Sequence, residues 1–185
     1  NVNFADNFSA AISTGADGGS VAYSLALTGT NVDSGWDTLA GNNIVMNQVG
    51  NVITGSEGGV DYFTITITPS TGEVSFDQLA AIKHTNTSSD DELSTLTAAT
   101  GALEVKATVT DGDNDVASET LDLSTGVFGI KDDGPSIDAA KVLAADTLTV
   151  DETDLTVDAD NVNFADNFSA AISTGADGGS VAYSL

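Results

Sequence analysis

The amino-acid sequence predicts an all-β protein built as an antiparallel β-sandwich, and three observations support this fold class. Apolar and polar residues alternate along several short segments, which is the period of a half-buried strand. Turn-forming residues, including 19 glycines, separate these segments at short intervals. Long helical patterns are absent from the sequence, so a parallel sheet covered by helices is not expected. A β-barrel stays open as the alternative architecture.

The first predicted hairpin spans residues 60–77. Its outgoing strand, VDYFTITIT, places Phe63, Ile65 and Ile67 on one face and polar residues on the other. The turn PSTG at 69–72 follows, because Pro fixes φ and Gly accepts a positive φ. The segment EVSF then returns as the second strand.

The second predicted hairpin spans residues 102–123. Its outgoing strand, ALEVKATVT, places Leu103, Val105, Ala107 and Val109 toward a core. The turn is DGDND at 111–115, and the segment VASETLDL alternates again as the return strand.

Other elements follow from shorter patterns. Further strands are expected at residues 20–27, 43–48, 51–54, 127–130 and 147–150. Residues 90–99 (DDELSTLTAA) predict a short helix, with Asp90 as its N-cap and acidic residues in its first turn.

The sequence repeats itself. Residues 1–25 recur letter for letter as residues 161–185, so the period is 160 residues. The segment KDDGPS supplies the best linker, because Pro and Gly interrupt regular structure there. We therefore expect a β-sandwich module at 1–133 that lacks its natural first strand region, a linker at 134–136, and the start of the next repeat at 137–185.

This organisation predicts a non-enzymatic protein whose partners are neighbouring repeats of the same chain, because tandem near-identical units are a structural or adhesive design. No signal peptide is visible, and we expect the chain to be part of a longer protein. Residues 137–160 carry the strand that a complete module needs before residues 1–25. They can fold back, stay with the second copy, or complete a neighbouring molecule by head-to-tail self-association.

The charge excludes several classes of protein. The chain has 28 acidic residues against four lysines, a net charge of −24, and no cysteine. We therefore expect no nucleic-acid binding, no disulfide framework and no Cys-ligated zinc. No apolar run approaches the ~20 residues of a membrane span, so no membrane insertion is expected. Three explanations of the charge stay open, namely bound calcium, a solvated acidic surface suited to salt, and the solubility of a secreted protein.

The sharpest acidic cluster is the turn at Asp111, Asp113 and Asp115. The D-x-D-x-D spacing matches the first half of an EF-hand loop, but Val116 stands where that loop needs Gly, and a strand follows instead of a helix. The pattern favours a Ca²⁺ site on a β-turn. The alternative is that Asp and Asn simply favour turns.

A second group of acidic residues surrounds the predicted linker, and one Ca²⁺ shared with the turn could clamp it between two modules. The alternative is a flexible, solvated linker. The candidate ligands added by this hypothesis are Asp132, Asp133, Asp151, Glu152 and Asp154.

Two single residues have a structural and a functional interpretation. His84 has no catalytic partner in a recognisable motif, so it is expected to anchor a loop. Trp36 either packs in the core or stacks on a sugar. The alternative function is therefore a directly adhesive module that binds a sugar or protein near Trp36 and Asp61, with its ligand-binding residues unknown.

Several motifs together resemble a known family. Residues 103–136, with the turn VTDGDND and the terminal KDDGPS, resemble the tandem repeat of giant RTX adhesins exported by type I secretion, as do residues 63–72, 82–84 and 150–152. The resemblance implies an extender domain, an all-β, antiparallel immunoglobulin-like or cadherin-like β-sandwich that calcium rigidifies at its junctions. It implies a secreted protein on the surface of a Gram-negative bacterium, projecting a distal ligand-binding region for attachment and biofilm formation. Calcium-binding roles carry over onto Asp111, Asp113, Asp132, Asp133 and Glu152.

Overall fold

The computed structural model describes residues 1–86, 88–156, 158–159 and 162–185. Three residues of the predicted segments 137–160 and 161–185, at positions 157, 160 and 161, lie outside this description. The chain divides into a first unit, residues 1–88 with 92–132, and a second unit, residues 89–91 with 133–185. The limits predicted above for the natural repeat stay a prediction.

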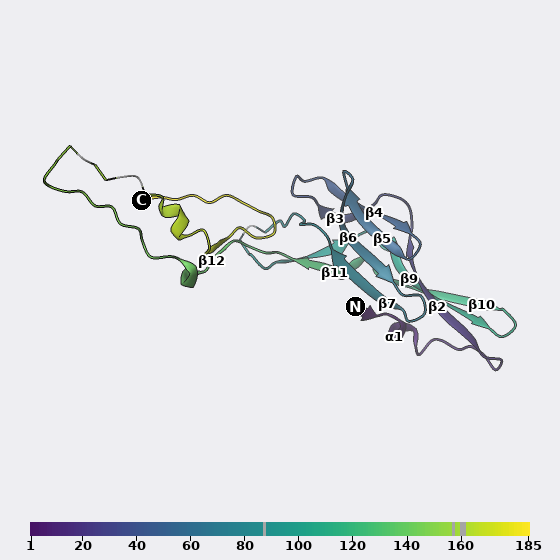
Figure 1. The fold of residues 1–185 in the computed structure, drawn as a ribbon. Coiled ribbons are helices and arrows are strands. Elements are labelled where there is room, and N and C mark those ends of the chain that lie inside the picture. The colour runs from purple at the N-terminus through teal and green to yellow at the C-terminus, as the bar shows by residue number, and fades with distance from the viewer. Residues whose placement is uncertain (87, 157, 160–161) are drawn as a thin grey trace. The chain divides into compact units, whose positions relative to one another are not determined.

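The first unit consists almost entirely of strands (Figure 1). Its elements are β1 (Val2–Asn3), α1 (Ala5–Phe8), β2 (Gly19–Leu27), β3 (Val32–Asp37), β4 (Asn43–Val49), β5 (Val52–Glu57), β6 (Val60–Ile67), β7 (Glu73–Gln78), β8 (Leu93–Thr97), β9 (Leu103–Asp111), β10 (Val116–Asp122) and β11 (Thr125–Lys131).

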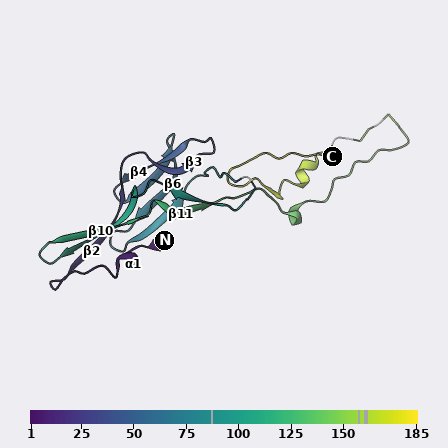
Figure 2. The same cartoon turned by 180° about the vertical axis from the view of Figure 1, so that it is seen from behind.

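The strands form antiparallel sheets, which confirms the all-β, sandwich-like fold. A six-stranded sheet has the order β1-β7-β6-β5-β4-β3, a three-stranded sheet has the order β10-β9-β2, and β11 pairs with β8. Figure 2 shows the same arrangement from behind. Among the described residues, β1 and β3 are the two ends of the six-stranded sheet and do not pair with each other, so this sheet does not close into a barrel.

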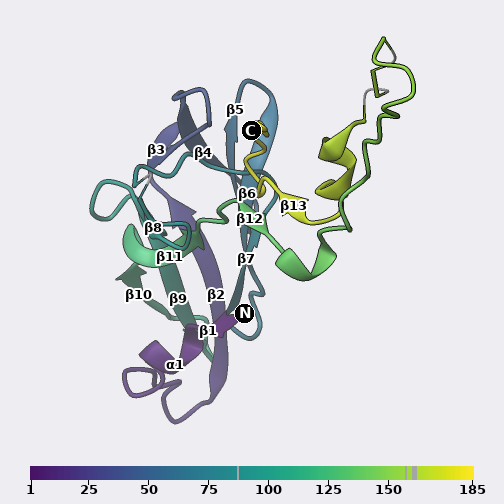
Figure 3. The same cartoon turned by 90° about the vertical axis from the view of Figure 1, so that its left-hand side faces the viewer.

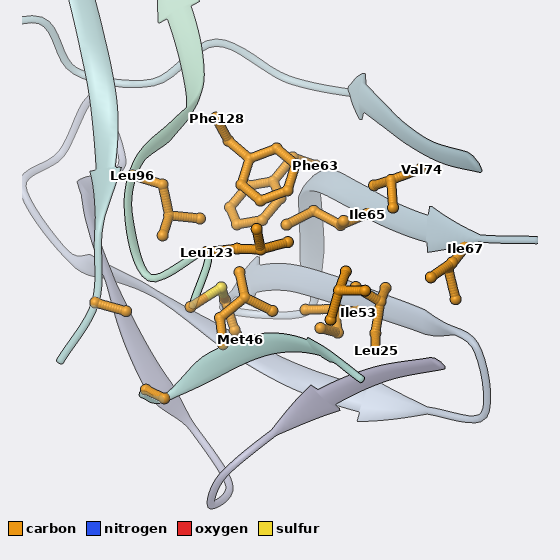
Figure 4. Close-up of a cluster of buried hydrophobic side chains, with 14 of the residues drawn as sticks. Leu25, Met46, Ile53, Phe63, Ile65, Ile67, Val74, Leu96, Leu123 and Phe128 are labelled. Atoms are coloured by element: carbon orange, nitrogen blue, oxygen red, sulfur yellow. The ribbon is translucent and has the colours of Figure 1, made fainter. Parts of the chain in front are cut away.

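Both predicted hairpins form, and the apolar faces of β6, β7 and β9 contribute to the core, whereas the return strand β10 is mostly exposed. Phe63, Ile65 and Ile67 on β6 are buried together (Figure 4). They belong to the same cluster as Leu103 and Val105 on β9. On β6 and β9, the alternation of apolar and polar residues thus predicts both the strand and the face that it buries.

The β3 strand at the edge of the six-stranded sheet is bulged. Its register against β4 shifts between Asp33 and Asp37, and Gly35 has a φ of 76°. A Cβ at Gly35 would lie 2.8 Å from the Thr97 carbonyl oxygen, so a side chain does not fit there. The Gly35 amide donates to the Asp33 carboxylate at 2.8 Å, which holds the bulge locally.

The helix predicted at residues 90–99 is wrong. Residues Leu93–Thr97 form β8, which pairs with β11 in the register Ser94↔Ile130. The acidic residues before Leu93 resemble a helix start, but β8 contains the β-branched Thr95 and Thr97 and has a partner strand. Tertiary pairing therefore outweighs the local capping pattern.

The strand predicted at residues 147–150 is also wrong, because that segment has no regular structure. Leu148 and Val150 are exposed. Two apolar residues that alternate with threonine do not form a strand where no second strand pairs with them.

The second unit has short elements (Figure 3). β12 (Ser136–Ile137) pairs antiparallel with β13 (Ile172–Ser173), and two 3₁₀ helices, η1 (Ala139–Lys141) and η2 (Phe164–Asn167), accompany them. Across the described ranges, no helix combines the length and the apolar character that crossing a membrane requires.

Candidate metal centre

The β9–β10 turn carries the candidate metal ligands. β9 ends at Asp111 and β10 begins at Val116. The Asp111 amide donates to the Asp115 carbonyl at 3.1 Å, and Asn114 takes a positive φ of 75°. Asn adopts this left-handed conformation more readily than most residues, so DGDND suits a tight turn.

The turn brings three carboxylates together. One ligand oxygen from each of Asp111, Asp113 and Asp115 lies within 4.8 Å of the others. Asp111 is half-buried, whereas Asp113 and Asp115 are exposed. In the part of the chain that the structure describes, this is the one group of three such side chains close enough to share a metal ion.

Hydrogen bonds fix the innermost carboxylate. The Asp113 carboxyl, which donates only when it is protonated, and the backbone amides of Asp115, Asp113 and Asn114 hold the pKa of Asp111 below its ordinary value of 3.8. The Asp115 amide donates to Asp111 Oδ1 at 2.8 Å. Asp111 is therefore ionised at neutral pH, which is the state that a cation requires.

A second loop lies against this turn, and no pattern in the sequence indicates this contact. The β2–β9 register places Gly19 opposite Asp111, so residues 13–18 lead directly to the turn. A Cβ at Gly112 would lie 2.9 Å from the Asp17 carbonyl oxygen, and Ser13 to Gly15 line an open hollow with Asp111 and Asp115. The glycine-rich stretch GADGG predicts only a loop, because spacing along the chain does not reveal its neighbour across the fold.

Asp132 is not brought to the turn of its own unit. It follows β11, and its amide donates to the Glu92 carbonyl at 2.8 Å. Figures 1 and 2 show the β9–β10 turn and the end of β11 at opposite ends of the first unit. Within that unit, Asp132 and the three turn carboxylates do not surround one ion.

Asp133 belongs to the second unit, where it holds a loop. Its Oδ2 accepts a hydrogen bond of 3.2 Å from the Ala176 amide. A Cβ at Gly175 would lie 2.3 Å from the Asp133 carbonyl oxygen, so the two backbones are in close contact. Glycine permits this approach.

The remaining predicted ligands make local contacts. Asp151 accepts from the amide and hydroxyl of Thr153, and Asp154 accepts from those of Thr156. These bonds, led by the threonine hydroxyls, hold the pKa of both carboxyls below the ordinary value. Glu152 lies exposed between them. Asp132, Asp133, Asp151, Glu152 and Asp154 thus stay predicted ligands.

The three turn carboxylates fit a hard cation. Ca²⁺ takes six to eight oxygen ligands, and carboxylates on a turn supply them without a dedicated cage. The turn provides a partial set, so further oxygens must come from water or from another segment. The structure thus supports a candidate cation site at Asp111, Asp113 and Asp115.

His84 lies beside Glu92 in a loop. The His84 side chain is nearly buried, and its Nδ1 lies 3.5 Å from Glu92 Oε1 without forming a hydrogen bond to it. Glu92 Oε1 instead accepts from the amides of Thr85 and Asn86 at 2.9 and 3.0 Å. This environment suits the predicted role of His84 in anchoring a loop.

Trp36 is a core residue. It is 1% exposed, and its ring lies 5.2 Å from Phe63 in an edge-to-face contact and 6.0 Å from Phe76 in a stacked one. A buried indole offers no face to a sugar ring. The alternative of a directly adhesive module therefore loses the aromatic residue on which it depended.

Comparison with known proteins places the chain in a family. Residues 1–124 match the model of the family described as Domain of unknown function (DUF5801). No curated protein and no solved structure matches the chain.

Proposed function

The chain belongs to this family of unknown function, and we propose that it is a calcium-rigidified structural extender repeat of a bacterial surface adhesin. The observation that carries the proposal is the convergence of Asp111, Asp113 and Asp115 within 4.8 Å on a strand-to-strand turn. Its role in the adhesin is to project a distal ligand-binding region, not to catalyse a reaction.

The net charge supports a bound cation. A charge of −24 on a chain of this size opposes a compact state through self-repulsion. Three carboxylates in one turn concentrate that repulsion, and a divalent cation converts it into attraction.

The repeated sequence supports Asp133 as a fourth ligand of the ion at the β9–β10 turn. Asp133 holds the Ala176 amide, and Ala176 is the repeat copy of Ala16. Ala16 lies in the loop beside the β9–β10 turn, and a Cβ at Gly15 meets no described atom within 4 Å. Where residues 133–185 begin a complete module, the linker therefore carries Asp133 toward the three turn carboxylates of that module.

This placement refines the ligand set expected from the sequence. The turn of a module would share its ion with the linker that precedes the module, instead of the one that follows it. An ion bound to both would fix the linker to the module body and stiffen the junction.

The proposal links calcium to export and to extension. Extracellular modules typically bind Ca²⁺ at roughly 10⁻⁴–10⁻³ M, so the low cytosolic concentration leaves the sites empty and the external medium fills them. Because the bound ion stabilises the folded state, the exported chain would fold and stiffen outside a Gram-negative cell.

Thermal unfolding with and without calcium tests the proposal. We expect millimolar Ca²⁺ to raise the Tm of the 185-residue chain relative to EDTA, and D113N/D115N to abolish this rise. The control D61N/D77N removes two exposed carboxylates elsewhere, so the net charge matches while the turn stays intact. A Ca²⁺-independent Tm for the unaltered chain, or an equal loss in both variants, would contradict the proposal.

A further inference from the structure

We propose that residues 162–185 of one molecule replace residues 2–25 in the first unit of a second copy of this chain, joining molecules head to tail. The two segments are identical in sequence, and only one of them is packed into a sandwich. The proposal concerns strand exchange and does not require calcium.

The two copies share the contacts around Phe8 and Phe168, although residues 5–8 form an α-helix and residues 164–167 a 3₁₀ helix. The ring centroids of Phe8 and Tyr23 are 6.2 Å apart with planes at 48°, and those of Phe168 and Tyr183 are 6.1 Å apart at 47°. The amide-to-carbonyl bond from Ala11 to Phe8 recurs from Ala171 to Phe168 at the same 2.8 Å. These local contacts of the second copy are therefore already formed, which lowers that part of the ordering cost of binding, whereas residues 179–185 still have to form a strand.

The two copies differ in what covers them. Tyr23 is 8% exposed whereas Tyr183 is 55% exposed, and Phe4 is 8% exposed whereas Phe164 is 39% exposed. In the second unit these aromatic side chains line an open groove of about 510 Å³. The apolar face that the first copy buries is thus available on the second copy.

The first unit holds its copy by backbone pairing. Residues 19–25 of β2 pair in register with residues 111–105 of β9, and β1 pairs with β7. Residues 179–185 carry the same side chains in the same order but belong to no strand in the described structure. They can make the same ladder wherever a β9 edge is vacated.

Contacts inside the second unit favour another molecule over the same chain as acceptor. β12 pairs with β13, the Asp138 amide donates to the Ala171 carbonyl at 2.8 Å, and the Asn167 Nδ2 donates to the Ala144 carbonyl at 2.6 Å. These contacts tie the segment after the linker to the copied segment. An exchange preserves these contacts only if residues 136–144 move into the acceptor molecule together with the copied segment.

If residues 162–185 instead replaced residues 2–25 of their own chain, these contacts would break. Ile172 would take the place of Ile12, next to the loop at the β9–β10 turn. Its partner Ile137 follows Asp132 by five residues, which span at most ~18 Å. Asp132 itself lies beyond β10 and β11, two strands of seven residues each that lead away from the turn. An acceptor in a second copy has no such constraint.

The exchange also restores the natural order of the repeat. Leu185 of one molecule would lie next to Ala26 of the other, because Leu185 is the copy of Leu25. Residues 134–185 of one molecule and residues 26–133 of the other then together supply one whole period.

The competition between identical segments sets how the assembly behaves. The incoming copy makes the same strand pairs and buries the same side chains as the copy that it displaces, so the entropy of association favours the resident. Assembly should therefore rise with protein concentration, and a substitution confined to one copy should decide the outcome.

Two glycines provide that substitution as a matched pair. A Cβ at Gly19 would lie 2.2 Å from the Thr110 carbonyl oxygen of β9, whereas a Cβ at Gly179 lies no closer than 3.4 Å to any described atom. G19A therefore weakens the resident copy. G179A leaves the second unit unstrained but blocks its copy from seating on β9.

Light scattering after refolding from urea at increasing protein concentration tests the proposal. We expect G19A to assemble at a protein concentration roughly tenfold or more below that of the unaltered chain. G179A and the double variant G19A/G179A should stay monomeric. A monomeric G19A protein, or assembly of G19A that G179A does not suppress, would overturn the proposal.

Disulfide trapping tests the pairing even if G19A lowers stability. The register pairs Ser24 with Lys106, and the chain has no cysteine of its own. In the G19A background, a mixture of S184C and K106C proteins should form a disulfide between unlike chains, identified by mass. The control mixture of S184C and V49C, whose valine lies exposed at the end of β4, should not. The absence of the S184C–K106C product would contradict the exchange.

Discussion

Trp36 Nε1 donates a hydrogen bond of 2.9 Å to Ser94 Oγ, across 58 residues of sequence. The bond joins β3, at the edge of the six-stranded sheet, to β8. Trp36 is 1% exposed, so water cannot replace the hydroxyl as acceptor. One side chain thus links two sheets and satisfies a buried polar group.

The variant S94A should lower the free energy of unfolding by about 1–3 kcal/mol, because it leaves the buried indole N–H without an acceptor. Urea denaturation measures the change. The control S70A removes an exposed hydroxyl in the β6–β7 turn and should change stability by less than about 0.5 kcal/mol. Equal effects of the two variants would show that the Trp36–Ser94 bond is not the source.

The variant G55A should destabilise the first unit through overpacking. A Cβ at Gly55 would lie 2.1 Å from the Phe63 ring, and Phe63 is fully buried beside Trp36 and Phe76. A shift of that ring costs about 1–3 kcal/mol in a packed core. Near-ultraviolet circular dichroism should report the moved aromatic rings, and chemical denaturation the lost stability. An unchanged aromatic spectrum would mean that the core absorbs the methyl group elsewhere.

The carboxylate of Asp122 should make the free energy of unfolding depend on pH in the acid range. The interaction with the Ser124 side chain, together with hydrogen bonds from the Ser124 and Gly101 amides, holds the pKa of Asp122 below its ordinary value of 3.8. The folded state therefore favours the ionised form, and this stabilisation is complete above pH 3.8 and lost as the pH falls through the folded-state pKa. We expect the unaltered chain to exceed D122N in stability at about pH 6 and the gap to narrow as the carboxyl protonates. D77N, at an exposed position, is the control; a gap independent of pH would contradict this assignment.

If one Ca²⁺ is shared at the junction, the Ca²⁺ affinity should depend on the presence of two periods. A polypeptide that spans two periods should bind Ca²⁺ more tightly than the 185-residue chain, because Asp133 of its internal linker would meet the turn of the next module. D133N in that linker should remove the gain, whereas D146N, an exposed carboxylate in the same segment, should not. Isothermal titration calorimetry measures both. Identical Ca²⁺ affinities in the one-period and two-period proteins would show that Asp133 is not a ligand of this ion.

The alternating patterns predicted most strands of the first unit, because the order of apolar and polar residues determines which face of a strand is buried. Phe63, Ile65 and Ile67 show this on β6, and the acidic turn followed from the spacing of Asp111, Asp113 and Asp115. These features depend on neighbours in sequence, so local physical rules suffice.

The errors arose where a distant partner decides the conformation. Residues 93–97 look like part of a helix until β11 pairs with them, and residues 147–150 look like a strand but pair with nothing described. The contact from Asp133 to Ala176 spans 43 residues. No local pattern encodes such pairings, so neither the β8 strand nor the position of Asp133 could be predicted.

The bulge at Gly35 has a consequence for the proposed array of repeats, to which the recurrence of residues 1–25 as residues 161–185 points. Neighbouring modules with nearly the same strands can cross-pair while they fold, and the edge strand of a sheet, as β3 is in the six-stranded sheet, is where such pairing begins. The shifted register between Asp33 and Asp37, with a carboxylate at each end, interrupts the row of backbone donors and acceptors that a foreign strand would need. In the proposed array, the irregular edge would thus help each module to fold with its own strands and not with those of its neighbours.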